Sequence, residues 1–468
     1  FFSSALPQSP PYLSWICRVM SGARQEPIEI PLSEEETEIY AEYKNATNKT
    51  ERDAAQVAFL RSNQFVRVKD PVVKEYERHR VQVTTFMLNV FKFRKWLNGQ
   101  GKPYKKAAGG MSDDGLYTVS PKLRELMPRG LHEVKFIGKD SCTTVLFRGI
   151  PKFSGLVASD EDEESNASAS IFFYDGQSLQ DAGRFYVTAK SNGENAKLGC
   201  RIIEGTTYLF AGSKNTCMVW PALIPRGEIQ PATDHNIPAQ FICLLWSHWY
   251  LKLSGEQQKA FATQMTEKFG TIMGEINTPW YEHVVPINEL FLECYAILDN
   301  DGRPVHPKCA FDFFKTHGIH QHYPSIAAAT PAEKKTPHRP ENLKEVFLKE
   351  SNIDKIGPDG LKLDAKTNYI SHVFFQSNDI KDLDDVVDKI RNASNTEGAV
   401  LYLTHKTSEK VIGLVKVKSS QYVVWRRLRE TMKSCLFRPL NNGEIEEFPT
   451  TTGGKPKGSK ENKPKTRG

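Results

Sequence analysis

The sequence predicts a mixed α+β fold in which antiparallel sheets with flanking helices follow a helical N-terminal region. Three observations support this. The segment Ser33-Glu34-Glu35-Glu36 is a capping box, which opens a long stretch of helical character. From residue 131 onwards, short runs rich in β-branched and aromatic residues end at Gly or Asp, as strands do. Further helical stretches then alternate with strands, and no internal repeat is present.

The first 130 residues divide into a leader and a helical region. Residues 1–30 are predicted to be a disordered leader, and we expect Met20 to be the true start. Residues 34–98 are predicted to be mostly helical with a break near Asp70-Pro71, because a residue before proline avoids the helical conformation. Within them, residues 83–96 form an apolar run with interspersed Lys and Arg, typical of a core helix. The helical N-terminal region therefore covers residues 31–130.

Strands dominate the next part of the chain. They are predicted for the runs EVKFIGK, TTVLFRG, SIFFYDG, RFYVTAK, CRIIEG and TTYLFAGS, and later for TIMGEI, HVVPI, LFLECYAILD, AVLYLTH and VIGLVKVKS. The acidic residues 160–164 interrupt the first group as a solvated loop. Ser254 caps an amphipathic helix that carries Phe261, Met265 and Phe269 on one face. These elements predict one large body over residues 131–430.

An insertion and a tail complete the organisation. Residues 326–390 are predicted to be an insertion that begins with a flexible linker, with helices over 341–350 and 382–393. A basic helix is predicted over residues 423–433. Residues 431–468 form a basic tail whose Gly, Pro and Lys content predicts disorder.

Charge and cysteine content limit the partners and the compartment. The net charge is +6, of which residues 453–468 carry +5, so the rest of the chain is nearly neutral. The tail is either a solubilising segment or a weak, salt-sensitive contact to nucleic acid. Eight cysteines without a C-x-x-C pair favour reduced thiols and a cytoplasmic or nuclear location. No apolar run reaches 18 residues, so no membrane partner is predicted.

The segment Lys190-Ser191-Asn192-Gly193 follows a predicted strand and contains a lysine that could act as a nucleophile. A protonated lysine is a poor nucleophile, but a partly buried amine can attack phosphorus or a carbonyl carbon. Gly193 would let the backbone turn sharply beside a ligand. Alone, the pattern favours a surface lysine in a hairpin turn.

Four charged residues downstream strengthen the nucleophile hypothesis. Glu275 and Glu397 lie on or beside apolar strands, and carboxylates of this kind can bind a ribose hydroxyl or a divalent metal ion. Lys416 and Lys418 alternate with apolar residues, so both ammonium groups face the same way and require an anion such as a nucleotide α-phosphate. The alternative for the Lys-Val-Lys strand is a solvated sheet edge.

In the order Lys-x-Asn-Gly, Gly-Glu, Glu-Gly-x-Val and Lys-x-Lys, these segments resemble motifs I, III, IV and V of the covalent nucleotidyltransferases, which are DNA ligases, RNA ligases and mRNA capping enzymes. The segments Arg148-Gly149-Ile150-Pro151-Lys152-Phe153 and Gly212-Ser213-Lys214-Asn215, with Tyr422-Val-Val-Trp425 after motif V, are similar to the ATP-dependent 5′–3′ RNA ligases of lancelet and related eukaryotes. The resemblance covers residues 147–430. It implies a nucleotidyltransferase (ATP-grasp-like ligase) core and an adenylylation activity over residues 131–430.

The resemblance also implies a role for each matching residue. Lys190 would attack the α-phosphate of ATP and form lysyl-AMP. Glu275 would hold the ribose, and Glu397 would coordinate Mg²⁺ (or Mn²⁺). The remaining residues that the resemblance places in contact with the nucleotide are Arg148, Lys152, Asn192, Gly193, Lys416 and Lys418. Met273 stands where relatives have an aromatic residue that stacks on adenine, and Phe291 is the alternative stacking residue.

The implied substrates are ATP and RNA ends, in RNA repair or tRNA splicing, with RNA end-healing enzymes as partners. The alternatives are a capping-type or DNA-ligase-type nucleotidyltransferase and an inactive RNA-binding relative. Only residues 431–468 follow the region of resemblance. They are too few for the β-barrel expected in a capping enzyme or a DNA ligase. For the group His306, Cys309, His317, His320 and His322, packing and surface roles are favoured over a zinc site. The basic residues 426–429 are either a solvated helix face or an RNA contact.

Overall fold

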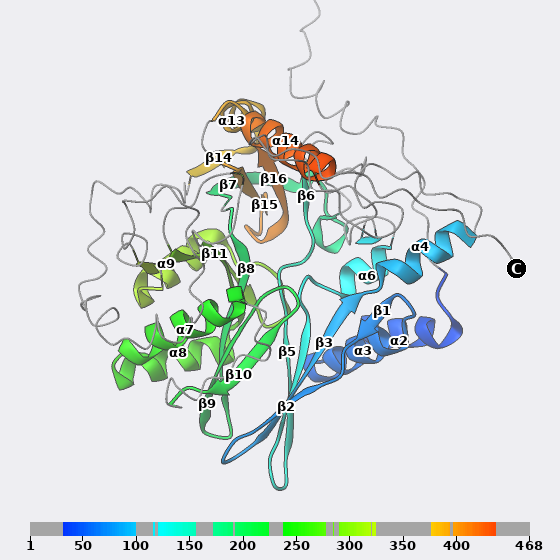
Figure 1. Ribbon diagram of the computed structural model, residues 1–468, viewed down its shortest axis with the longest axis vertical. Helices are drawn as coiled ribbons and strands as arrows, with labels where there is room; N and C mark the ends of the chain where they lie inside the picture. Colours follow the sequence, from blue (N-terminus) through cyan, green and yellow to red (C-terminus); the bar gives the residue numbers. More distant parts are fainter. Residues whose placement is uncertain are drawn as a thin grey trace, which may run out of the picture. The chain divides into compact units, whose positions relative to one another are not determined.

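Three β-sheets organise the part of the chain that the structure describes (Figure 1). The structure is a computed structural model. The residues it describes are 31–99, 116–117, 120–155, 172–190, 192–223, 237–277, 284, 290–319, 321–323, 376–393 and 396–436. The chain forms two compact units, residues 1–423 and 424–468, and all three sheets belong to the first.

The first sheet is antiparallel and belongs to the N-terminal part. Its strands run in the order β1-β3-β4-β5, and β2 pairs with β3 on the edge opposite β4, next to β1. The strands are β1 (Val66–Val68), β2 (Val72–Glu75), β3 (Arg80–Leu88), β4 (His132–Ile137) and β5 (Cys142–Phe147). The accompanying helices are α2 (Glu34–Asn45), α3 (Lys49–Ser62), α4 (Val90–Gly99) and α6 (Pro121–Leu126). The predicted capping box is confirmed, because Ser33 Oγ accepts from Glu36 N at 3.1 Å while the Glu36 carboxylate accepts from Ser33 N at 2.8 Å.

The prediction of a helix over residues 83–96 is wrong for its first half. Val83 lies within strand β3, and a helix begins only at Val90. Val81, Val83, Thr84 and Thr85 are β-branched, and such side chains lose rotamer freedom in a helix but pack well on a sheet. The partner strand β4 decides the outcome by pairing along β3 from Arg80 to Thr85. The N-terminal region is thus not purely helical, and its sheet continues across residue 131.

The second sheet has six antiparallel strands in the order β10-β9-β8-β11-β12-β13. They are β8 (Glu194–Ile203), β9 (Thr206–Gly212), β10 (Cys217–Pro221), β11 (Phe269–Asn277), β12 (Leu290–Asp299) and β13 (Gln321–Tyr323). One face is covered by α7 (Ile237–Lys252), α8 (Gly255–Glu267) and α9 (Pro307–His317). The predicted cap of α8 is confirmed, since Ser254 and Gln257 form a capping box. Trp246, Trp249 and Tyr250 of α7 are buried in the core between these helices and the sheet.

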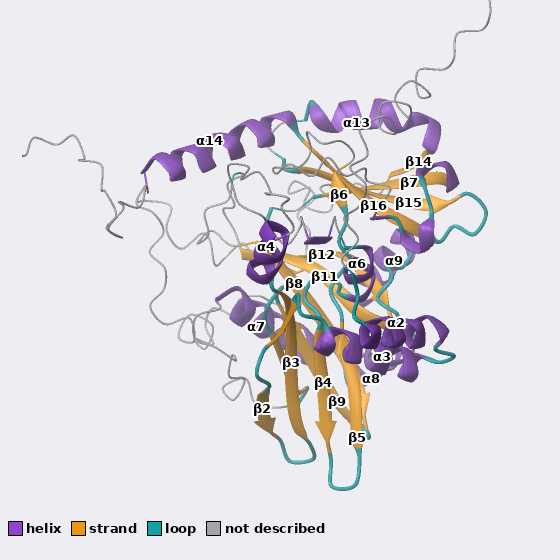
Figure 2. Cartoon of the chain, turned by 90° about the vertical axis from the view of Figure 1, so that its right-hand side faces the viewer, coloured by secondary structure: helices purple, strands orange, loops and turns teal. Residues whose placement is uncertain are grey.

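The third sheet has the strand order β14-β7-β15-β16-β6. Its strands are β6 (Ser154–Gly155), β7 (Ala182–Ala189), β14 (Gln376–Asp379), β15 (Gly398–His405) and β16 (Val411–Lys418). All pairs are antiparallel except β16 with β6. Helix α13 (Leu383–Arg391) covers one face through Leu383 and Val387 (Figure 2).

The face of the second sheet away from its helices contacts both other sheets. Around β8–β10 it packs on the first sheet through Phe136, Phe147, Tyr208 and Phe210. Around β11 and β12 it packs on the third sheet in a cluster that includes Met273, Val400 and Tyr402. The segment after β5 reaches the third sheet, where β6 pairs with β16, and the residues that follow β5 and β7 were predicted to bind a nucleotide.

Other sequence predictions have mixed outcomes. The strand predicted for SIFFYDG is wrong over residues 172–176, which form a turn with a 3₁₀ helix at Tyr174–Gly176. Asp175 and Gly176 have positive φ angles of 53° and 72°, which a strand does not allow. The remaining predicted strands are found, except HVVPI, of which only Val284 is described. The predicted helix over 341–350 lies outside the described residues, and the predicted insertion is described only from Gln376.

The basic helix at the end of the body is longer than predicted. Helix α14 runs from Ser420 to Leu436 and so continues six residues into the predicted tail. Beyond Leu436, the tail lies outside the described residues. Within the described chain, no helix combines the length and apolar character that a membrane span requires.

Candidate functional site

The predicted nucleophile lies at the edge of the third sheet where β7 ends and its neighbour β15 begins. Lys190 directly follows β7, and Glu397 directly precedes β15. The backbone N–H of Lys190 donates to the carbonyl of Gly398 at 2.9 Å, which continues the ladder between the two strands. This register places the side chains together, with Lys190 Nζ 2.8 Å from Glu397 Oε1. The side chains are only 19% and 5% exposed, so the ion pair is largely shielded from water.

Glu275 of β11 reaches the same place from the second sheet. Its Oε2 accepts a hydrogen bond of 2.8 Å from the backbone N–H of Gly193, in the loop after Lys190. A side chain at position 193 would meet the carbonyl of Ile276 at 2.6 Å and Asn277 Oδ1 at 2.7 Å. Glycine is therefore needed for close approach of the loop to β11. The chain also bends at Gly193, as we expected, but without a positive φ angle, so close approach is what favours glycine here.

The three charged groups are electrostatically coupled. Burial opposes a charge on Lys190, but the carboxylates of Glu397 and Glu275 outweigh it and raise the pKa of Lys190 above its ordinary value. Burial also raises the pKa of Glu275 to about 8, against the opposing effect of Lys190. At neutral pH, Lys190 is therefore held in its ammonium form, and the raised pKa of Glu275 favours its protonated form.

The two predicted phosphate-binding lysines lie on β16 beside this site. Gly398 and Val400 of β15 pair with Lys418 and Lys416, respectively. Lys418 is buried, and its Nζ lies 5.9 Å from the centroid of the Tyr422 ring. Because β16 lies between β15 and β6, the alternative of a solvated edge is wrong.

Tyr422 is a site residue for which the sequence indicated no role. Its hydroxyl lies 3.4 Å from Asn192 Oδ1, so it joins α14 to the loop after Lys190. Three residues earlier in the chain, Ser419 makes two hydrogen bonds. Its Oγ donates to the carbonyl of Thr396, and its backbone N–H donates to the carbonyl of Glu397. These contacts fix Glu397 from the chain that follows β16. Apart from the spacing after Lys418, no pattern in the sequence could have indicated them.

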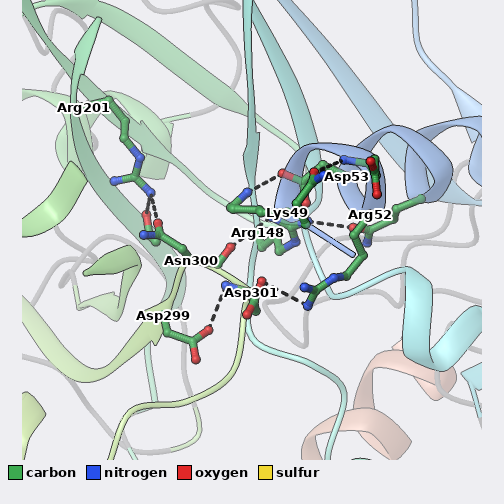
Figure 3. Close-up of polar contacts among 12 residues, drawn as sticks. Lys49, Arg52, Asp53, Arg148, Arg201, Asp299, Asn300 and Asp301 are labelled. Atoms are coloured by element: carbon green, nitrogen blue, oxygen red, sulfur yellow. Dashed lines mark hydrogen bonds and ion pairs between the residues drawn. The ribbon is translucent and has the colours of Figure 1, made fainter. Parts of the chain in front are cut away.

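The two residues after β5 that were predicted to contact the nucleotide, Arg148 and Lys152, lie in different surroundings. Lys152 is buried beside the start of β6. Arg148 is also buried, but its guanidinium is directed to α3 and to the turn after β12 (Figure 3). It lies 2.5 Å from Asp53 Oδ1, 2.8 Å from Gln56 Oε1 and 3.5 Å from the carbonyl of Asn300. Among the residues that the structure describes, these are its polar partners. Arg148 thus joins the N-terminal helices to the core.

Replacing Arg148 with alanine is expected to destabilise the fold by about 3 kcal/mol, because it leaves Asp53 without its buried partner. Lys49 still pairs with Asp53 and keeps the loss at the lower end of the range. The matched control is Arg52→Ala, which removes the exposed pair of Arg52 with Asp301. That change should cost less than about 1 kcal/mol. Urea unfolding followed by circular dichroism measures both, and equal effects would contradict the structural role of Arg148.

The residues considered for adenine stacking differ in their surroundings. Met273 is buried among apolar side chains between the second and third sheets. The side chain of Phe291 lies outside the described part of the chain. A further aromatic residue, Tyr295 of β12, lies close enough to Glu275 for its charge, after burial, to raise the tyrosine pKa, and its carbonyl accepts a hydrogen bond from the Tyr402 hydroxyl.

The carboxylate of Glu397 fits a hard divalent cation such as Mg²⁺, which commonly uses one or two protein carboxylates together with phosphate oxygens. In the described chain, no group of three or more His, Cys, Asp or Glu side chains could hold a metal ion. His306 caps α9, and His317 packs on Phe313 and Phe261, so these two have the packing roles that we favoured over zinc. His320 and the side chain of His322 are outside the described residues.

Comparison with models of protein families, with curated proteins and with solved structures finds no match to this chain.

Proposed function

We propose that this protein is an ATP-dependent RNA ligase that works through a lysyl-AMP intermediate. The observation that carries the proposal is the shielded contact of 2.8 Å between Lys190 Nζ and Glu397, with Glu275 bound to the neighbouring loop. A buried lysine with two carboxylates and two further lysines on an adjacent strand suits nucleophilic attack on a phosphate ester. The motif order in the sequence provides independent support.

The proposed chemistry has three steps. The Lys190 amine, after losing its proton, attacks the α-phosphorus of ATP, and the bond to the departing pyrophosphate breaks. An oxygen of an RNA 5′-phosphate then attacks the same phosphorus and releases the lysine. Finally an RNA 3′-hydroxyl attacks the activated 5′-phosphate, loses its proton and displaces AMP. A divalent cation would be held by Glu397, and when bound it would neutralise charge on the phosphate oxygens.

The chain's own residues prepare the first step. Lys416 and Lys418 supply positive charge from β16 towards the phosphate. Protonated Glu275 can donate a hydrogen bond to a ribose hydroxyl while Gly193 holds its other oxygen. The resting contact between Lys190 and Glu397 keeps the nucleophile protonated, so deprotonation limits its reaction at neutral pH.

Denaturing electrophoresis after incubation with Mg²⁺ and either α-labelled ATP or α-labelled GTP tests the proposal. We expect covalent label from ATP only, with a rate that rises about tenfold per pH unit between pH 6 and 8 because the amine is the reactive form. Label from GTP would indicate a capping-type enzyme. No label from either nucleotide would contradict the ligase proposal and favour an RNA-binding relative. Joining of 5′-phosphate DNA strands, but not RNA strands, would instead indicate a DNA ligase.

A further inference from the structure

Lys197 is a buried cation that the proposed chemistry does not use. It lies on β8, paired with Gly212 of β9 and Met273 of β11, and its side chain is fully buried. Its Nζ donates to the carbonyl of Gly130 and lies 5.0 Å from the centroid of the Phe147 ring. Among the described residues, no carboxylate forms an ion pair with it. Burying a charged amine without a carboxylate partner costs free energy.

The surroundings of Lys197 include one further basic group, His132, and no carboxylate that pairs with it among the described residues. Burial lowers the pKa of Lys197 to about 7, with a small opposing effect from the buried Cys217 thiol of β10. Burial and then the charge of Lys197 lower the pKa of His132 on β4 well below its ordinary value. Two basic groups therefore share this interior, and the charge of Lys197 disfavours a proton on His132. Lys197 is substantially uncharged just above neutral pH.

Two tight backbone contacts connect Lys197 to the candidate site. Gly130 has a φ of +75°, and a side chain there would meet Lys197 Nζ at 2.8 Å and the carbonyl of Lys214 at 2.9 Å. Next to it, the N–H of Arg129 donates to the carbonyl of Ile150 at 3.3 Å. A side chain on Gly149 would collide with the carbonyl of Arg129 and lie 3.4 Å from Lys197 Cδ. Lys197 thus supports residues 129–130 directly and residues 148–150 through them.

We propose that Lys197 is a positioning residue for nucleotide binding, which holds the 129–130 turn and thereby places the 148–152 segment, with Lys152 at its end, against the Lys190 site. The inference rests on the proposed adenylyl transfer. Lys197 does not touch the reacting atoms. A change there should alter substrate affinity more than the chemical step, because the nucleophile and its carboxylates stay on β7, β11 and β15.

The test compares Lys197→Met, which keeps the length but removes the donor, with Lys197→Gln, which retains a donor on a shorter chain. We expect the methionine variant to raise KM for ATP in lysine labelling about tenfold with kcat changed less than about threefold, and the glutamine variant to recover part of the loss. In the wild type, KM should rise as the pH falls from 8 to 6, since Lys197 then gains a proton within an apolar interior. The methionine variant should lose this contribution and keep only that of Glu275, whose loss of its proton raises KM as the pH rises.

Hydrogen exchange of the same variants gives a readout that does not depend on activity. In Lys197→Met, faster amide exchange should be confined to residues near 129–130 and 148–152. Unchanged exchange there, or wild-type KM with a wild-type pH profile, would overturn the inference. Faster exchange throughout the first unit would show a general structural role and would overturn it too. If the wild-type chain takes no label from ATP, the proposed function fails, and localised exchange still decides whether Lys197 holds the two segments.

Discussion

Replacing Lys190 with alanine is expected to abolish covalent labelling by ATP, with a loss of at least about 10,000-fold, because no second nucleophile can replace a removed one. Alanine also leaves Glu397 buried without its cation, which should cost about 3–5 kcal/mol of folding free energy. Loss of label alone could therefore reflect unfolding.

Lys190→Arg removes this ambiguity. Arginine keeps a permanent positive charge beside Glu397 but is not deprotonated in the working pH range, so it cannot attack phosphorus. The arginine variant should unfold in urea close to the wild type and still take no label. Covalent label on the arginine variant would show that another residue is the nucleophile, and the proposed mechanism would fail.

Much of the fold could be predicted because local patterns and tertiary packing agree. Strands such as β9 and β16 alternate or are continuously apolar between turn residues, and α8 carries its own capping box. Strand β3 could not be predicted in this way. Its apolar run suits a buried helix or a buried strand equally, and only pairing with β4, some 50 residues later, decides between them.

The candidate site shows the same division. The order of the motifs indicated which residues belong together, and the structure brings Lys190, Glu397, Glu275 and Lys418 together across strands that are far apart in sequence. The partners of Arg148 could not be predicted, because Asp53 and Gln56 lie on a helix outside the resemblance. Lys197 gave no signal either, since a lysine in a strand normally faces water. Its burial depends on the first sheet, which covers that face with Phe147.

Removing the Glu397 carboxylate is the second change with a large expected effect. Glu397→Ala and Glu397→Gln should both lower the rate of lysine labelling at least about 100-fold, because neutral side chains cannot hold a divalent cation at the phosphate. Glutamine preserves the size of the side chain and a hydrogen-bond acceptor near Lys190. Equal losses in the two variants would therefore assign the effect to charge and not to shape.

Loss of the Glu397 carboxylate also removes the ion pair with Lys190, and this should change the pH dependence of stability. Without Glu397, the nearest acid for Lys190 is Glu275, whose pKa is about 8 in the wild type partly because Glu397 is also negative. In Glu397→Gln the pKa of Glu275 should fall, since the like charge is gone and Lys190 needs a partner. In the wild type, the raised pKa of Glu275 makes stability fall as the pH rises from 4.5 towards 8, because the folded state binds more protons there. Melting temperatures between pH 5 and 8.5 should show a smaller decline in Glu397→Gln.

The matched control is Glu293→Gln. Glu293 lies on β12 directly opposite Glu275 and also raises its pKa, but no role in cation binding is proposed for it. Its replacement removes one negative charge from the same neighbourhood, as Glu397→Gln does. We expect it to leave labelling and the Mg²⁺ concentration for half-maximal rate within about threefold of the wild type, because the screened charge of a neighbouring strand contributes little. If Glu293→Gln matched Glu397→Gln, the general charge of the region would explain the loss, and Glu397 would have no special role as a cation ligand.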